Sequence, residues 1–343
     1  MSKFPAVYLS RPATILPETA IENDEIIELV RESFNGNAAE WEPIELGIRY
    51  VFDRCNSKVR YIERDTTLSP GEFAARAAAA CLEQNGVAAS DLDLLIYGGV
   101  ARDAFEPATA AEVAGRLGAE PLQVLDVTCA CAGLIEALHV VAGYFALHDD
   151  IQTALVCAGE ITRDRVTYDF QSFENVAVDV AGLTLGNAAA AFLVTRKPLP
   201  GGGARIRGFT HKTLSEHWAL CRAPVDGHFM SQSKELFALG VNVAPELRRL
   251  MAEVGWSPEE INHYVFHQPS EASVERLFAD LGARPGAGIL THSLFGNTAS
   301  TSWVLALDHR LKQGGVHNGD KIVIASAAAG FTIVAAAGEW ESE

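Results

Sequence analysis

The chain has 343 residues, 48% of them hydrophobic and 21% charged, which suits one large globular unit or two similar halves. Its formal net charge of −17 argues against nucleic acid as a partner, so an anionic substrate must find a local basic patch. Six scattered cysteines in apolar contexts and a start without a signal-peptide core predict a reduced, cytoplasmic protein. Gly, Ser, Thr or Asn interrupt the most apolar windows, Val178–Val194 and Ile322–Ala337, so we expect no membrane span.

The chain begins irregularly and becomes regular from Ser69 onward. We expect a strand within Ala6–Leu16, an amphipathic helix over Asn23–Phe34 and a loop or broken helix over Gly36–Tyr50. Ser-Pro at its start and Gly86 at its end then bound a helix. The following elements are predicted in order: a strand over 92–100, a helix over 109–117, a strand over 122–128, a helix over 131–147 and a strand over 152–159.

The same order of elements returns in the second half of the chain. The predicted elements there are a helix over 243–254, a strand over 262–266, a helix over 270–281, a strand over 287–291, a helix over 298–312 and a strand over 321–326. The interval from Gly86 to Cys131 is close to that from Gly255 to Asn297. We interpret this as a duplicated α/β unit, with halves at 1–195 and 196–343.

Two such halves predict two mixed sheets that enclose buried helices. The apolar helices over 131–147 and 298–312 are the candidates for the central layer. Between the halves, Gly201–Gly203 reads as a hinge, and Arg205–Met230 reads as an excursion over the surface or over a pocket.

Cys131 lies where an apolar β-branched strand gives way to a helix. A thiol at a helix N-terminus feels the positive end of the peptide dipoles, which favours the thiolate. The small residues Ala132 and Gly133 leave room for a substrate at the sulfur. The alternative is an inert buried cysteine, which is common. A metal site is not indicated, because no further ligands stand nearby at zinc-site spacing.

His267 and Asn297 occupy the second half at places that the duplication brings near Cys131. His267, in VFHQPS, follows a strand that matches LLIYGG, and Asn297, in LFGNTAS, holds the place that matches Cys131. Taken alone, His267 could be a structural residue and Asn297 a helix cap. Taken together, a thiol, an imidazole and a carboxamide suit acyl transfer, because His and Asn can stabilise negative charge on a carbonyl oxygen.

These segments resemble the thiolase-fold condensing enzymes, specifically the β-ketoacyl-ACP synthase III group. DVTCACAGLIEAL is similar to the nucleophile motif of that family, VFHQPS to its His motif, LFGNTASTS to its Asn motif and GFTIVAAAGEW to its closing hairpin. The resemblance covers nearly the whole chain from Arg54 onward, with the motifs in the family order. It implies a thiolase-like α/β fold, a layered α-β-α-β-α sandwich of two duplicated halves.

The resemblance also implies a mechanism. Cys131 would take an acyl group from a CoA or acyl-carrier-protein thioester, with no permanently bound cofactor or metal. His267 and Asn297 would then bind the thioester carbonyl of a malonyl-type extender, whose enolate attacks the acyl-Cys in a Claisen condensation. The oxyanion hole would use the N–H groups of Cys131 and Ala329. The family is homodimeric, and Phe105, in DAFEPATA, matches a loop that enters the acyl pocket of the partner.

The chain departs from the family pattern at several places. The Gly-rich turn of the family is ASAAAG here, and the segment before Arg54 lacks the Trp–Arg pattern expected for CoA binding. Ala238 stands where the carrier-docking helix usually has a basic residue. Arg248 and Arg249 could take the place of that basic residue. These changes indicate specialised polyketide or fatty-acid-related metabolism. The alternatives are acyl transfer from Cys131 to an oxygen or nitrogen of a small molecule, and a non-catalytic subunit of a heterodimer.

Overall fold

The computed structural model describes residues 5–119 and 122–342, and residues 1–4, part of the start expected to lack a signal peptide, lie outside them. The strands are β1 (Tyr8–Ser10), β2 (Ala13–Ile15), β3 (Ala20–Glu22), β4 (Val59–Tyr61), β5 (Leu94–Tyr97), β6 (Gln123–Asp126), β7 (Thr153–Glu160), β8 (Ala188–Thr195), β9 (Gly203–Thr213), β10 (Cys221–Arg222), β11 (Met230–Ser231), β12 (His263–Phe266), β13 (Lys321–Ala328) and β14 (Thr332–Glu341). The helices are α1 (Asn23–Ser33), α2 (Ala38–Cys55), α3 (Pro70–Asn85), α4 (Thr109–Leu117), α5 (Gly133–Leu147), α6 (Phe173–Asp179), α7 (Ser233–Leu239), α8 (Val243–Glu253), α9 (Glu271–Leu281), α10 (His292–Phe295) and α11 (Ser302–Lys312).

The main strands follow one hydrogen-bonded path, β12-β13-β14-β9-β1-β8-β7-β5-β6, and β2 also pairs with β8. Pairing of β1 with both β8 and β9 joins the strands of the two halves, so the structure has one continuous sheet in place of two separate ones. Within each half a parallel pair, β5-β7 or β12-β13, lies beside an antiparallel one, β7-β8 or β13-β14.

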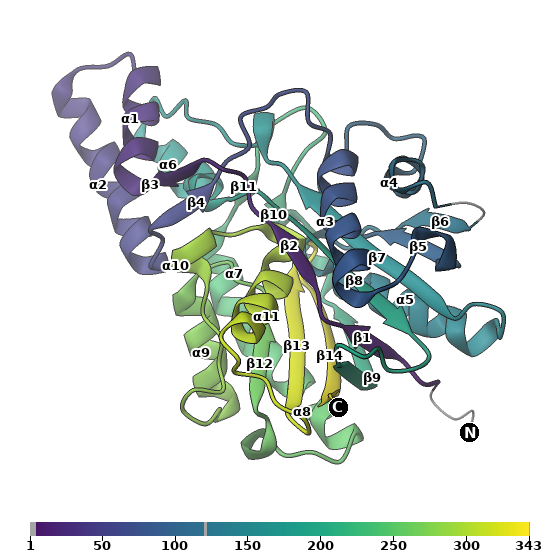
Figure 1. Ribbon diagram of the computed structural model, residues 1–343. Coiled ribbons are helices and arrows are strands. Elements are labelled where there is room, and N and C mark those ends of the chain that lie inside the picture. The colour runs from purple at the N-terminus through teal and green to yellow at the C-terminus, as the bar shows by residue number, and fades with distance from the viewer. Residues whose placement is uncertain (1–4, 120–121, 343) are drawn as a thin grey trace.

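Successive side chains along a strand pack on opposite faces of the sheet, and these contacts show that the sheet has two leaves with helices between them. On β7, Val156 joins a core cluster with α5 and α11, whereas its neighbour Leu155 packs with α3 and α4. On β13, Ile324 joins the same central cluster, whereas Val323 packs with α8 and α9. The layers are therefore helix, sheet, helix, sheet and helix, the thiolase-like sandwich (Figure 1).

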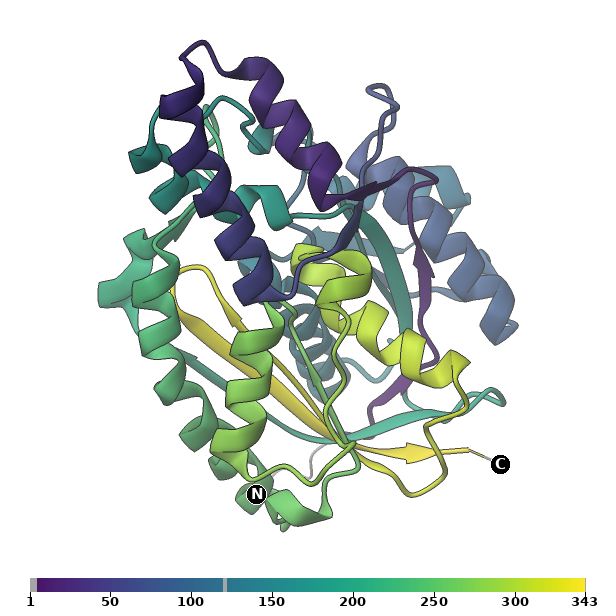
Figure 2. The same cartoon turned by 90° about the vertical axis from the view of Figure 1, so that its left-hand side faces the viewer.

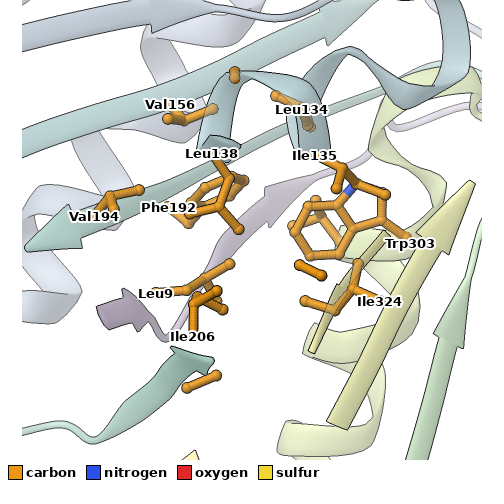
Figure 3. Packing of buried hydrophobic residues seen from close by; sticks show 14 of the residues in the cluster. Leu9, Leu134, Ile135, Leu138, Val156, Phe192, Val194, Ile206, Trp303 and Ile324 are labelled. Carbon is orange, nitrogen blue, oxygen red and sulfur yellow. The ribbon is translucent and has the colours of Figure 1, made fainter. Parts of the chain in front are cut away.

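The central layer packs the two halves together. Figure 3 shows Leu134, Ile135 and Leu138 of α5 next to Phe192 of β8 and Trp303 of α11. The Phe192 and Trp303 rings lie 5.5 Å apart. By composition alone, Ala130–Leu147 is long and apolar enough to cross a membrane, and half of this stretch is buried within the protein.

The duplication extends to single hydrogen bonds. Asp93 donates its backbone N–H to the carbonyl of Thr153 and accepts the Thr153 N–H at Oδ2. Asn262 likewise donates its backbone N–H to the Lys321 carbonyl and accepts the Lys321 N–H at Oδ1, and Lys321 is the first residue of β13 as Thr153 is of β7. The two pairs start equivalent strands of the two halves, and the boundary between residues 195 and 196 stays a prediction.

Three sequence predictions about elements are wrong. The segment Gly36–Tyr50 lies mostly in α2, which begins with a capping box formed by Asn37 and Glu40 and continues through Pro43. Residues 287–291 form only an isolated bridge from Gly288 to Tyr264. The first part of the expected excursion, 205–213, is a central strand, β9, bonded to β14 and β1.

A separate cluster lies at one end of the molecule. Helices α1 and α2, purple at the top of Figure 2, pack on one another and on the segment 166–185. The small β3-β4 sheet connects this cluster to the main body. In this cluster, α2 and α6 lie at the edge of the cavity described below.

Candidate active site

A cavity of about 1340 Å³ lies where strands from both halves end. Its walls include Glu160 at the end of β7, Phe266 at the end of β12 and the last residues of β13. Ligands of α/β proteins bind at such carboxyl ends. Every site residue predicted from the sequence lines this one cavity: Phe105, Cys131, His267, Asn297 and Ala329.

Cys131 is presented by a sharp turn between β6 and α5. It sits in a 3-10 turn, Ala130–Ala132, and Ala130 has φ of +44°. A left-handed non-glycine residue costs about 1 kcal/mol or more, and such strain collects at functional sites. Gly133 serves a different purpose from the one expected, because a Cβ there would lie 2.0 Å from the Gly98 carbonyl oxygen. Its small size lets α5 approach β5, and it does not clear space for substrate.

The expected thiolate at Cys131 is wrong for the resting protein. Burial raises the pKa of the Cys131 thiol well above its ordinary value, and the Cys221 and Glu160 side chains raise it further. Desolvation therefore outweighs the helix dipole. The thiol is neutral until a base or a bound substrate removes its proton.

His267 follows β12 and is held from two sides. Its backbone N–H donates to the Ala325 carbonyl at 2.9 Å, and its Nδ1 lies 2.7 Å from Ser302 Oγ. Burial, together with a smaller effect of the nearby His292, lowers the pKa of His267 to about 3. The imidazole is therefore neutral at physiological pH.

Asn297 is fixed by its backbone and by its own side chain. Its N–H donates to the Thr184 carbonyl at 2.9 Å, and its carbonyl accepts the Gly186 N–H at 3.0 Å. Its Oδ1 accepts the Ala299 N–H at 3.0 Å, the local bond that the capping alternative predicted. Because Oδ1 is thus engaged, the Nδ2 group is the part of the carboxamide left to donate to a ligand.

The repeat places a different residue opposite Cys131 than we expected. Ala299 has φ of +48° and opens a 3-10 turn, as Ala130 does. Ser300 is therefore the counterpart of Cys131, and Asn297 precedes it by three residues. Sequence spacing alone missed this offset because it cannot locate a single strained residue within a loop.

Glu160 is the site residue that the sequence reasoning missed. Its side chain is buried, only 3% exposed, and accepts the N–H groups of Val100 and Ala101 and the hydroxyl of Ser300. It thereby ties the loop that leads to Phe105 to the turn after Asn297. Its position at the end of a buried strand was the available signal.

The two other predicted residues, Phe105 and Ala329, also line the cavity. Phe105 is 86% exposed on the loop between β5 and α4, at the rim. Ala329 follows β13 at the hairpin whose next residues, Gly330 and Phe331, have φ of +83° and +43°. The hairpin keeps a tight left-handed turn although its residues are mostly alanine.

The later part of the excursion, 214–230, forms a wall of the cavity. Arg165 holds it by donating to the carbonyls of Pro224, Val225 and Gly227. Cys221 and Phe229 of this segment line the cavity. The segment is thus a pocket wall, one of the two roles that the sequence left open.

The cavity lining carries more positive than negative side chains, against the net charge of the whole chain. Among the described residues, seven cationic side chains line the cavity against three carboxylates; the cations are Arg54, Arg102, Arg163, Arg165, Arg222, Lys234 and Arg276. The arginines expected to replace the missing docking residue are engaged elsewhere: Arg249 pairs with Glu246 and Glu253, and Arg248 donates to the Asp280 carbonyl. The Arg276 guanidinium lies 4.8 Å from the centre of the Phe237 ring instead, and Lys234 lines the cavity with both residues. Among the residues that the structure describes, no group of three acidic, His or Cys side chains could hold a metal.

Comparisons with known proteins agree with this architecture. Residues 251–340 match the family described as 3-oxoacyl-[acyl-carrier-protein (ACP)] synthase III C terminal. The β-ketoacyl-[acyl-carrier-protein] synthase III of Rhodospirillum centenum is 27% identical over 95% of this chain and 96% of that protein. The acyl-CoA:acyl-CoA alkyltransferase of Xanthomonas campestris pv. campestris is 27% identical over 80% of this chain and 84% of that protein.

Solved structures share the whole fold. Cerulenin-bound OleA of Xanthomonas campestris superposes with a TM-score of 0.89 at 25% identity, covering 98% of both chains. The site geometry, the family match and these relatives lead to one assignment. The chain is a β-ketoacyl-ACP synthase III-like condensing enzyme of the thiolase superfamily, a thioester-dependent acyltransferase.

Proposed function

We propose that Cys131 accepts an acyl group from a thioester and that a second thioester, as its enolate, attacks the acyl-Cys to form a carbon–carbon bond. The observation that carries this proposal is the cavity shared by Cys131, His267 and Asn297. A nucleophile, a neutral imidazole and a carboxamide donor in one apolar cavity supply what a Claisen condensation needs. No residue of the set is replaced, which speaks against a non-catalytic subunit.

The residues take distinct roles in this proposal. Asn297 Nδ2 and His267 hold the carbonyl of the second thioester, where negative charge develops in the enolate. The backbone N–H groups of Cys131 and Ala329 stabilise the oxyanion formed when the enolate attacks the acyl-Cys. Support comes from the presence of both residues in the lining of the same cavity.

The substrate that we propose is a long-chain acyl thioester. The cavity exceeds the range of about 300–1000 Å³ usual for small-ligand pockets. Side chains of α2 and α6, among them Val51, Phe173 and Val176, extend it between apolar walls. A relative is named acyl-CoA:acyl-CoA alkyltransferase, and an OleA variant of the same fold was solved with lauric acid and lauroyl-CoA.

Two chemical sources could supply the enolate. A malonyl-type thioester loses CO2, whereas a second acyl-CoA loses a proton from its α-carbon. The cavity volume and the alkyltransferase relative favour a second acyl chain. The synthase III relatives and the resemblance of the three motifs favour the malonyl-type extender.

Delivery and assembly complete the proposal. The cationic lining suits the phosphates of CoA or the acidic surface of an acyl carrier protein. We propose a cytoplasmic homodimer, without nucleic-acid or membrane partners, in specialised polyketide or fatty-acid-related metabolism. Phe105 at the rim would then contribute to the site of the partner subunit.

One experiment tests the function. Purified protein is incubated with acyl-CoA of several chain lengths, with and without malonyl-CoA, and both CO2 and products are measured. A new carbon–carbon bond supports the proposal, and release of CO2 identifies the malonyl-type route. An ester or amide product without a new carbon–carbon bond would favour acyl transfer to oxygen or nitrogen, and the absence of every product would overturn the proposal.

A further inference from the structure

The segment that leads to Asn297 runs beside β12 and pairs with it once. Tyr264 donates its backbone N–H to the Ala287 carbonyl at 2.8 Å and accepts the Ile289 N–H at 3.3 Å. This is the pattern of a parallel pair, in which Tyr264 lies opposite Gly288. The bridge is isolated within the described chain, so backbone pairing of this segment with β12 ends there.

The side-chain amide of Gln268 continues the pairing where the backbone stops. Its Nε2 donates to the Ile289 carbonyl at 3.0 Å, and its Oε1 accepts the Thr291 N–H at 3.0 Å. A backbone residue opposite Leu290 would form the same two bonds in a parallel ladder. The second hydrogen of Nε2 goes to the Phe266 carbonyl at 2.9 Å. Two carbonyls face Nε2 and one N–H faces Oε1, so these partners fix the orientation of the amide.

The backbone of Gln268 adds a third bond to the segment 289–292. His292 Nδ1 lies 3.0 Å from the Gln268 carbonyl oxygen, and because a carbonyl can only accept, Nδ1 donates the hydrogen. Gln268 and His292 have no exposed surface, and Thr291 is 1% exposed. Loss of any of these bonds would therefore leave a buried polar group without a partner, which is costly.

Backbone bonds of α10 extend this connection to Asn297. The Thr291 carbonyl accepts the Phe295 N–H at 3.0 Å, and the His292 carbonyl accepts the Gly296 N–H at 2.8 Å. Asn297 is the next residue. A displacement of Thr291 is therefore passed through one short helix to Asn297.

We infer that Gln268 is a positioning residue that holds Asn297 in register with His267, so that both side chains reach the same carbonyl of the second thioester. The other backbone bonds of Asn297, to Thr184 and Gly186, relate it to the first half of the chain. The Gln268 bonds relate it to β12, which His267 follows. The inference rests on the proposed function for the carbonyl that His267 and Asn297 hold, whereas the register itself rests on the hydrogen bonds.

The variant Gln268→Met, of similar size, removes the three side-chain bonds and should separate two steps. Transfer of the acyl group to Cys131 should continue at close to the wild-type rate, because the groups proposed for that step, Cys131 and Ala329, lie on other elements. Condensation with the second thioester should fall roughly a hundredfold, the effect of a displacement of about 1 Å at a reacting group. Intact-protein mass spectrometry measures the first step, and the yield of carbon–carbon product measures the second. Unchanged condensation, or equal losses in both steps, would overturn the inference.

Two milder variants test the same connection while the Gln268 side chain stays in place. His292→Leu removes only the bond to the Gln268 carbonyl, so condensation should fall and acyl loading should not. His292→Asn can donate from its amide to that carbonyl and should recover most of the lost condensation. Equal condensation by His292→Leu and the wild-type protein would contradict the inference.

A matched control separates this role from lost stability. Asn85 is also buried, and its Nδ2 likewise donates to two backbone carbonyls, those of Cys81 and Arg11. It lies on α3, away from His267 and Asn297. Asn85→Leu should lower the melting temperature as Gln268→Met does and leave both steps unchanged.

Crystal structures of the wild-type protein, Gln268→Met and Asn85→Leu test the register without any activity. We expect the Asn297 carboxamide to be displaced from the His267 ring in Gln268→Met and in neither of the others. An unchanged separation in Gln268→Met would overturn the inference even if the enzyme condenses thioesters. A displaced Asn297 in a protein whose wild type forms no carbon–carbon product would support the positioning role and refute only the proposed function.

Discussion

Ser300 donates its hydroxyl hydrogen to the carboxylate of Glu160, a bond that joins the first half of the chain to the second. The same carboxylate accepts the Val100 and Ala101 N–H groups, so one buried side chain holds two loops that border the cavity. Both loops lead to residues with proposed roles, Phe105 and Asn297. The halves are therefore fixed to one another at the site itself.

Replacing Glu160 by Gln should separate activity from thiol reactivity. The carboxamide cannot accept all the hydrogens that now converge on the carboxylate, so the loops shift and condensation should fall roughly ten- to a hundredfold. The lost negative charge should at the same time lower the pKa of the Cys131 thiol and speed its alkylation by iodoacetamide at a fixed pH. Glu246→Gln is the matched control, because Glu246 is also buried but pairs with Lys212 and Arg249 away from the cavity. Slower alkylation of the Glu160→Gln variant would contradict the expectation that the Glu160 charge raises the pKa of the Cys131 thiol.

The pH dependence of Cys131 alkylation should be that of an isolated, buried thiol. Because burial raises the pKa of this thiol and lowers that of His267 to about 3, the thiolate fraction should grow about tenfold per pH unit through the neutral range. Rates of iodoacetamide inactivation between about pH 6 and pH 9 should therefore rise steadily. A flat profile over this range would reveal a resting thiolate–imidazolium pair and refute the neutral state.

Much of this fold is readable from the sequence because the duplication repeats strong local signals. Helix α3, for example, is bounded by Ser69 and by Gly86 in the left-handed conformation, as its sequence predicts. Helix α2 is not predicted from the sequence because a proline such as Pro43 disfavours a helix interior. Asn37 and Glu40 nevertheless have the spacing of a capping box.

The site is readable in part. Motifs predict Cys131, His267 and Asn297 as site residues, but the pKa of the Cys131 thiol depends on burial and on side chains distant in the chain, among them Cys221. Glu160 and Ser302 act through hydrogen bonds across the fold, and no sequence spacing encodes those contacts.

Trp218 should contribute to binding of acyl-CoA. This residue is 62% exposed, and the guanidinium of Arg222, a lining residue of the cavity, lies 6.0 Å from the centre of its ring. Such a pair can stack an adenine base, so Trp218→Ala should raise KM for acyl-CoA roughly fivefold without changing kcat. KM for an acyl-pantetheine thioester, which has no adenine, should not change. Trp256→Ala, which removes a similar pair with Lys321 outside the cavity, is the control, and an equal rise for both thioesters would refute the role.

Phe105 should act across a dimer interface. It is almost fully exposed, and β6, the last strand of the path, has no further strand of the described chain at its outer edge. An unpaired edge is a template for a second copy. We expect Phe105→Ala and Cys131→Ala to be weakly active alone and to recover activity when mixed, because a mixed dimer has one site with both residues. Absence of recovery, despite subunit exchange seen by native mass spectrometry, would place Phe105 in its own chain's site.

Gly133 and Gly143 lie on the same helix and should respond oppositely to substitution by alanine. A Cβ at Gly133 would lie 2.0 Å from the backbone oxygen of Gly98, which cannot move without displacing β5. Gly133→Ala should therefore lower the melting temperature and slow acyl loading, because the helix start that carries Cys131 must shift. At Gly143 an added Cβ meets no atom within 4 Å, and helix propensity predicts a gain of up to about 1 kcal/mol. Thermal unfolding and acyl-Cys131 mass spectrometry of the two variants measure both effects. If the two variants had equal melting temperatures and equal loading rates, α5 would be free to move away from β5. The close packing of α5 on β5 would then not be what positions the Cys131 thiol.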